Sequence, residues 1–328
     1  MSNSDIVSSV SKPGDYYYDP VNDRFRGMVP QFVSNPERLQ EDWRTFVNQA
    51  DSDPHQASRL TLRAVTTPET AAQADRQLTE AYIPVTAGAG LLYLAMNTPG
   101  RQPQLPVDVM NKTVDTVASD IQHRFRPPAG RLPELRARGY SFTDRVTDPE
   151  GQRALWGPTF GWNAENIQNL ETRLAANARR DPADRDIWFT GVLSDGHVVA
   201  AALAERLDVP GPNGKLPTIE STEWVVDPSR RHAGLACGML ALNAAQCLQD
   251  LPNARILAEC RFSTTAYAAG MSIGFAVPAL GSTPQILARN VWVDGELADF
   301  VPISLPDEAV REHYSPTARA EMLSYLNQ

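Results

Sequence analysis

The chain has 328 residues, 42% of them hydrophobic and 21% charged, so it can bury a sizeable core and is not wholly disordered. This length favours two domains, or one large domain with an appendage. The formal net charge of -9 and the pI near 5.1 argue against a protein that coats nucleic acid, because phosphate binding needs a basic face.

The cysteines and the N-terminus favour a soluble cytoplasmic protein. Cys237, Cys247 and Cys260 lack the Cys-x-x-Cys spacing of a zinc site, and their odd number leaves at least one free thiol. The opening MSNSDIVSSV has no positive segment followed by an apolar core, so it is not a secretory signal. The longest weakly apolar stretch, residues 83–96, is too short to span a membrane. We expect neither a membrane nor a nucleic-acid partner.

The first part of the chain is predicted to be an arm and a helical region. Residues 1–33 are rich in Ser, Asp, Pro and Gly, which predicts a flexible arm. Helix-start signals follow at Asn35 and at Thr67, and a third helix is expected after Pro106. Residues 34–133 are therefore predicted to form a mostly helical region of unknown role, which ends in the proline-rich boundary segment RPPAGRLP.

Beyond this boundary, strand and helix patterns alternate. Apolar alternation and turn signals predict strands at residues 140–146, 186–193, 197–207, 218–226 and 255–260, and a closing hairpin at 286–305. Helices are expected after Asp148, at about 164–179, at about 234–249 and at about 264–272. This order predicts an α+β domain at residues 134–306 with a mixed, largely antiparallel sheet flanked by helices, followed by a C-terminal helical tail at residues 307–328.

The turn DPSRRHAGLACGML, which leads from a strand into a helix, is the best candidate binding site. The first turn of a helix offers unpaired N–H groups and a favourable dipole for an anion, and Gly234 permits close approach of a phosphate. Arg230 and Arg231 can add charge-assisted contacts. Neither Gly-Lys-Ser/Thr nor Gly-x-Gly-x-x-Gly is present. From the residues alone, a phosphate cradle and an ordinary strand-to-helix turn stay equally open.

The segment from Val226 to Ala236 resembles the coenzyme A motif of GNAT-type N-acetyltransferases, Val-x-Pro-x-x-Arg/Gln-x-x-Gly-x-Gly/Ala. Residues 263–275 resemble the family's short helix that ends in Gly-Phe. Residues 287–305 look like the closing hairpin of the branch that contains the ribosomal-protein N-terminal acetyltransferases. The resemblance covers roughly residues 140–305. Residues 60–82 also faintly resemble the family's first strand and helix, so a discontinuous domain or a degenerate second one stays open.

The resemblance implies transfer of an acyl group, usually acetyl, from acetyl-CoA to an amine, without a metal. It implies a set of coenzyme-binding residues: Val226, Arg231, His232, Ala233, Gly234, Leu235, Ala236 and Ser263.

The resemblance also suggests where the catalytic groups lie. Glu220 stands where many members carry the base, and Glu223, expected on the opposite face of the strand, is the alternative. Either carboxylate could instead be a solvated or salt-bridged strand residue. Gly270 replaces the family's acid tyrosine, and Tyr267 is a substitute acid or a packing residue.

Three functions follow from these observations. The first is direct acetyl transfer to a small-molecule amine or a peptide N-terminus. The second is a non-catalytic acyl-CoA-binding regulator whose N-terminal region engages a partner, an alternative that Gly270 keeps open. The third is a helical interaction module whose turn binds nothing. A homo-oligomer is compatible with each of them.

Overall fold

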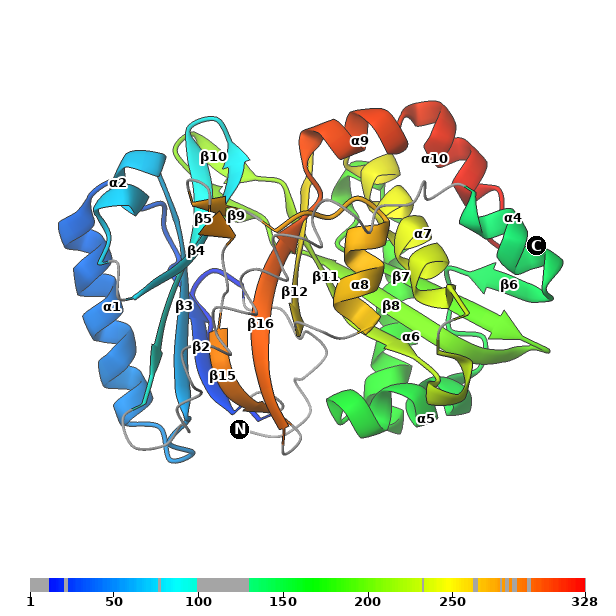
Figure 1. Ribbon diagram of the computed structural model, residues 1–328, viewed down its shortest axis with the longest axis horizontal. Helices are drawn as coiled ribbons and strands as arrows, with labels where there is room; N and C mark the ends of the chain where they lie inside the picture. The colour runs from blue at the N-terminus through cyan, green and yellow to red at the C-terminus, as the bar shows by residue number, and fades with distance from the viewer. Residues whose placement is uncertain are drawn as a thin grey trace.

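The structure is a computed structural model that describes residues 12–20, 23–75, 78–98, 130–231, 233–261, 265–277, 279–280, 283–284, 288–293 and 296–327. The chain folds around two main sheets, one built from residues 16–97 and one from residues 140–304 (Figure 1). The first sheet and its helices are drawn in blue to cyan, and the second sheet and its helices run from green to red. Within the described ranges, none of the helices is both long and apolar enough to cross a membrane.

The N-terminal half forms a five-stranded sheet in the order β1-β2-β3-β5-β4. Its elements are β1 (Tyr16–Asp19), β2 (Arg24–Met28), α1 (Pro36–Asp51), β3 (Arg59–Thr66), α2 (Pro68–Gln73), β4 (Thr79–Thr86) and β5 (Ala89–Asn97). Both predicted helix starts are confirmed. The side chains of Asn35 and Thr67 cap the helices that follow them, by accepting from the backbone N–H of Arg38 and Thr70.

Two predictions for this half were wrong. Residues 1–33 are not simply an arm, because β1 and β2 pair within the sheet. Residues 34–133 are not mostly helical, because β3, β4 and β5 lie among them. The helix that starts at Thr67 ends already at Gln73, and the chain returns as the strand β4. The helix predicted after Pro106 lies outside the described residues.

The two faces of the first sheet differ sharply. Leu60, Leu62 and Ala64 of β3 are buried in one cluster with Trp43 and Phe46 of α1. The intervening side chains of β3 include the buried Arg63, which lies against the second sheet. The helices α1 and α2 therefore cover one face, and the second half of the chain covers the other (Figure 1).

The C-terminal half forms a seven-stranded sheet in the order β15-β16-β12-β11-β8-β7-β6. Its main elements are α4 (Arg131–Ala137), β6 (Tyr140–Thr143), α5 (Pro149–Phe160), α6 (Ala164–Asn177), β7 (Ile187–Ser194), β8 (His197–Arg206), β11 (Thr218–Val226), α7 (Leu235–Asp250), β12 (Arg255–Arg261), α8 (Thr265–Ser272), β15 (Ala288–Val293) and β16 (Glu296–Ser304). Neighbouring strands are antiparallel except β11 and β12. This confirms the predicted mixed, largely antiparallel sheet flanked by helices.

Short elements complete this half. A small hairpin of β9 (Val209–Gly211) and β10 (Gly214–Leu216) precedes β11, and β13 (Ala279–Leu280) pairs with β14 (Thr283–Pro284). Residues after 306 form α9 (Asp307–His313) and α10 (Pro316–Leu323). The helix α4 spans the predicted boundary at residue 133, and its Leu132 and Leu135 belong to the core of the second half.

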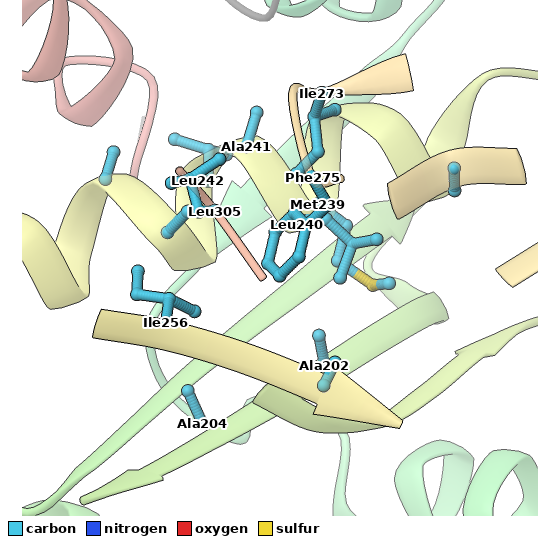
Figure 2. Packing of buried hydrophobic residues seen from close by; sticks show 14 of the residues in the cluster. Ala202, Ala204, Met239, Leu240, Ala241, Leu242, Ile256, Ile273, Phe275 and Leu305 are labelled. Atoms are coloured by element: carbon cyan, nitrogen blue, oxygen red, sulfur yellow. The ribbon is translucent and has the colours of Figure 1, made fainter. Parts of the chain in front are cut away.

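Helices cover both faces of the second sheet. On one face, α7 supplies the main core (Figure 2), whose labelled residues include Met239, Leu240, Ala241 and Leu242 of α7, Ala202 and Ala204 of β8, and Ile256 of β12. On the other face, α5 and α6 bury Trp156, Ile167 and Leu170 against Phe189 and Leu203. The helix α7 is apolar around most of its circumference because the sheet, α4, α8 and α10 surround it.

Candidate functional site

The two central strands of the second sheet part in the middle of the sheet. β11 and β12 are parallel and pair only from Thr218 with Arg255 to Glu220 with Leu257. β11 then runs on to Val226, while β12 pairs with β16 along its remaining length. The strands therefore leave an opening after Glu220, on the side of the sheet from which the chain enters α7.

A β-bulge marks the β11 side of this opening. The register between β11 and β8 shifts between Thr222 and Val225, and Glu223 within the shift has a φ of 55°. A non-glycine residue in this left-handed region is strained, and such strain is concentrated at functional sites. The bulge also breaks the regular alternation of the strand, on which the prediction of opposite faces for Glu220 and Glu223 depends.

The turn after β11 ends in a helix N-terminus without a side-chain cap. Gly234 is the N-cap of α7, with a φ of 82° and no side-chain hydrogen bond to the helix. The first intrahelical bond of the ladder runs from the Gly238 N–H to the Gly234 carbonyl, so the preceding amides of the first turn have no helical acceptor. A Cβ on Gly234 would meet nothing within 4 Å. The turn thus has the conformation, the donors and the open side that a phosphate needs.

Neighbouring side chains hold this turn in place. The Asp227 carboxylate accepts from the Ser229 N–H and hydroxyl, each at 2.8 Å, and these bonds hold the pKa of Asp227 below its usual range. Arg138, at the end of α4, donates to the Ala233 carbonyl at 2.7 Å. Arg231 is exposed beside the turn, free of the core. The turn is therefore fixed from both sides while its basic residue faces solvent.

A narrow apolar slot continues from the turn toward the strand opening. It is lined by Trp224, Val226, Ala236, Met239, Leu240 and Ala266. The slot joins the end of β11, the first turns of α7 and the start of α8. Its lining side chains are apolar, with polar atoms exposed among them, which suits a flexible, uncharged arm that carries amide groups better than a charged group.

Trp224 of the slot packs beside Gly270 of α8. The Trp224 indole N–H donates to the Ser221 hydroxyl at 2.9 Å, and its ring meets Phe275 edge-on at 6.0 Å. A Cβ on Gly270 would lie 2.6 Å from Cδ1 of Ile303 and 3.5 Å from Cζ3 of Trp224. The space beside residue 270 is thus already filled, which explains why a glycine stands there.

Glu220 lies in a buried cluster of ion pairs between the two sheets, which we call the seam. Arg63 of β3 donates to Glu220 at 2.6 Å, and Arg24 of β2 donates to Glu259 of β12 at 2.8 Å. Arg26 approaches Glu220 at 3.8 Å and Glu259 at 3.9 Å. Each of these side chains is at most 7% exposed. The predicted base is therefore the counter-ion of arginines from the first half.

The seam perturbs the ionisation of its members. Burial raises the pKa of Glu259, but the charges of Arg24, Arg26 and Arg63 outweigh it and lower the value to about 2. Burial lowers the pKa of Arg63, and the opposing charge of Glu220 raises it by more, so its net pKa is above the ordinary value. Glu259 and Arg63 are thus both charged throughout the neutral range.

The structure brings together several of the predicted site residues. Val226 and Ala236 line the slot, and Ala233 and Gly234 form the turn. Leu235 is 1% exposed in the core, so only its backbone can face a ligand. His232 and Ser263 lie outside the described residues.

The predicted catalytic residues are buried. Glu223 is 5% exposed at the bulge. Tyr267 is 1% exposed within the α7 core and follows Ala266 of the slot. Within the described ranges, no cluster of three or more His, Cys, Asp or Glu side chains is arranged to hold a metal ion.

Three functional candidates were missed in the sequence. Trp224 stands in the predicted strand at residues 218–226, but only the slot reveals that it lines a pocket. Arg138 and Arg63 act on residues 95 and 157 positions away. No local pattern could have found these two arginines, because each depends on a contact between distant segments.

No protein-family model matches the sequence, and no curated protein matches it. Solved structures with a similar arrangement were found. The ribosomal-protein-S18-alanine N-acetyltransferase of Escherichia coli is 19% identical, covers 51% of this chain and 93% of its own, and has a TM-score of 0.34. An acetyltransferase of the GNAT family from Streptococcus pneumoniae is 10% identical, covers 50% of this chain and 98% of its own, and scores 0.39.

A third similar structure contains a ligand. The PaiA N-acetyltransferase of Thermoplasma acidophilum, in complex with coenzyme A, is 13% identical, covers 50% of this chain and 97% of its own, and has a TM-score of 0.31. These structures are acetyltransferases, and one belongs to the family that the turn motif resembles. Their TM-scores lie below 0.5, so the function of this chain has to be argued from its own turn, slot and strand opening.

Proposed function

We propose that this chain is a cytoplasmic acyltransferase that moves an acetyl group from acetyl-CoA to a primary amine. The observation that carries the proposal is the uncapped N-terminus of α7 at Gly234, which leads directly into the slot and the strand opening. The amides of residues 233–236, with Arg231 beside them, would hold the pyrophosphate. Val226 and Ala236 would lie along the pantetheine arm.

The chemistry sets requirements for the chain's own residues. When bound, acetyl-CoA supplies a thioester whose C–S bond is exchanged for a C–N bond to the amine. A base must take a proton from the ammonium group before the nitrogen attacks, and the departing sulfur must gain a proton. Tyr267 or a water molecule would supply that proton, because the packing around Gly270 leaves no room for a tyrosine there.

The base is better assigned to Glu223 than to Glu220. The Glu220 carboxylate already pairs with the buried Arg63 at 2.6 Å, so it serves the seam rather than the slot. Glu223 instead lies beyond the point where the strands part, next to Trp224 of the slot. The acceptor would be a small-molecule amine or a peptide N-terminus.

A second function is favoured by one observation. Glu220 is held in the seam and the position of the usual acid is packed by Ile303 and Trp224, so both expected catalytic positions serve the fold. A non-catalytic acyl-CoA-binding regulator would have the turn and the slot without turnover.

Titration calorimetry with acetyl-CoA tests the donor site. We expect micromolar binding that Gly234→Trp abolishes, because the indole would fill the open side of the turn. Gly161→Trp is the matched control, since Gly161 has a φ of 73°, nothing within 4 Å of its Cβ position, and lies at the end of α5. Loss of binding in both variants, or in neither, would refute the assignment.

Thiol release with a panel of amines separates catalysis from mere binding. We expect Glu223→Gln to lower kcat by about 100-fold or more at neutral pH while binding is retained. Glu220→Gln is expected to lower stability first. An unchanged turnover in Glu223→Gln would exclude Glu223 as the base. The absence of thiol release with every amine, despite binding, would favour the regulator.

A further inference from the structure

The first half repeats the strand and helix order of the second half. Its sheet order β1-β2-β3-β5-β4 corresponds to β8-β11-β12-β16-β15. The directions also agree: in each set the second and third strands are parallel, and the other neighbouring pairs are antiparallel. A helix of 16 residues joins the parallel strands in both, α1 in the first half and α7 in the second.

The repeat extends to the helices and their faces. A short helix follows the third strand in each half, α2 after β3 and α8 after β12. The helices α1 and α2 contribute to one core cluster, as α7 and α8 do in the second half. The elements that precede the repeat in the second half, from β6 to β7, have no counterpart among the described residues before β1. The two halves therefore share a core of five strands and two helices.

The copy lacks the strand opening. β2 and β3 are paired from Arg24 with Arg59 to Met28 with Arg63, which is the whole length of β2. The pairing continues beyond β2, because Val29 donates to the Arg63 carbonyl at 2.8 Å and Val33 to the Val65 carbonyl at 2.9 Å. No gap corresponding to that between β11 and β12 is left.

The copy also lacks the open helix N-terminus. The segment from Val29 to Asn35 contains no glycine, whereas the corresponding turn of the second half has Gly234. The Asn35 side chain accepts from the Arg38 N–H at 2.7 Å, and Pro36 has no N–H to offer. The donors that stay open at α7 are thus capped or missing at α1.

The free face of the copy covers the second sheet. Residues Met28, Val65 and Tyr93 of the first half share a buried cluster with Leu257 of β12, Leu207 after β8 and Val209 of β9. Beside this cluster lies the seam, in which Arg63 and Arg24 pair with Glu220 and Glu259. The first half covers the face of the second sheet that is opposite to α7. The helices α5 and α6 pack on this same face, against other strands.

We propose that the N-terminal half is a second copy of this core that binds no coenzyme and acts as a fixed cover over β11 and β12. The whole chain then binds one coenzyme molecule. The expected stoichiometry of one coenzyme per chain rests on the proposed function. The role of the first half as a cover does not, because it depends only on the contacts between the two halves.

Titration calorimetry on the full chain measures the stoichiometry. We expect one acetyl-CoA per chain and no residual binding in Gly234→Trp, with circular dichroism to show that the variant is folded. Two molecules per chain, or one molecule bound by a folded Gly234→Trp variant, would overturn the inference while leaving acetyl-CoA binding intact. If the wild-type chain binds no acetyl-CoA, the proposed function fails, and the cover is decided by the second measurement.

A double-mutant cycle on Arg63 and Glu220 tests the cover. Each single variant, Arg63→Met and Glu220→Met, removes the nearest partner of a buried charge and leaves it a longer contact, from Arg26 to Glu220 at 3.8 Å or from Arg63 to Glu259 at 3.9 Å. We expect the Tm to fall by roughly 5 to 10 °C. The double variant should recover most of this loss, because the two side chains act as one unit. Strictly additive losses, or no loss in either single variant, would show that the first half is not fixed against the second.

Discussion

The carboxylate of Glu259 makes the stability of this protein depend on pH in a specific way. Its pKa is lowered from 4.5 to about 2, since the charges of three arginines outweigh the opposing effect of burial. A carboxylate whose pKa is depressed by folding stabilises the folded state above pH 4.5. This contribution is lost as the pH falls from about 4.5 to about 2. We therefore expect acid to loosen the seam.

The size of the effect follows from the change in pKa. A depression from 4.5 to about 2 corresponds to about 3 kcal/mol of folding free energy at neutral pH. In Glu259→Gln the buried Arg24 loses its charged partner at 2.8 Å and keeps its pairing with Asp19 at 2.9 Å. The variant should thus be less stable than the wild type by about 3 kcal/mol at pH 7. The difference should shrink toward zero near pH 2.

Urea unfolding at a series of pH values from 7 to 2.5 measures both curves. Glu41→Gln is the matched control, because Glu41 forms a surface pair with Arg38 in which both side chains are more than half exposed. Its effect should stay below about 0.5 kcal/mol at every pH. Wild-type and Glu259→Gln curves that run parallel across this range would refute the reasoning, whatever the size of the gap between them.

Further expected outcomes concern the slot and the thiols. Trp224→Ala should widen the slot. We expect kcat/KM for longer acyl-CoA donors, measured by thiol release, to rise by about tenfold relative to acetyl-CoA. An unchanged preference for acyl chain length would contradict this role of Trp224. Iodoacetamide should label Cys237 first in the native protein, because burial raises the pKa of both Cys247 and Cys260, and mass spectrometry would identify the site. Acetyl-CoA should slow that labelling, since Cys237 lies in the first turn of α7; labelling that is indifferent to acetyl-CoA would argue against the donor site.

The donor turn could be predicted because it is contiguous. Residues 226–236 place a strand end, a glycine and a helix start in one short segment, and each has a local signature. The alternating pattern likewise predicts the strands of the second sheet. The strand opening could not be predicted in this way, because it depends on where the pairing of β11 with β12 stops rather than on the composition of either strand.

The first half shows a different limit. Leu60, Leu62 and Ala64 alternate as expected for a strand with one buried face. The helix-start signals at Asn35 and Thr67 are equally local, and they predict where a helix begins but not how far it extends. The role of Glu220 could not be predicted either, because its partner Arg63 lies 157 residues away on another sheet. Side chains whose partners lie on another sheet carry no local signal of that pairing.

The seam also constrains how this sequence can change over time. Replacing one member of a pair such as Arg24 and Glu259 leaves a buried charge without that counter-ion and destabilises the fold. Replacing both together costs much less folding free energy. Substitutions at these positions should therefore appear as correlated pairs among homologous chains, joining residues more than 200 positions apart. The two halves therefore have to evolve together, because a substitution at a seam position of one sheet requires a compensating substitution in the other.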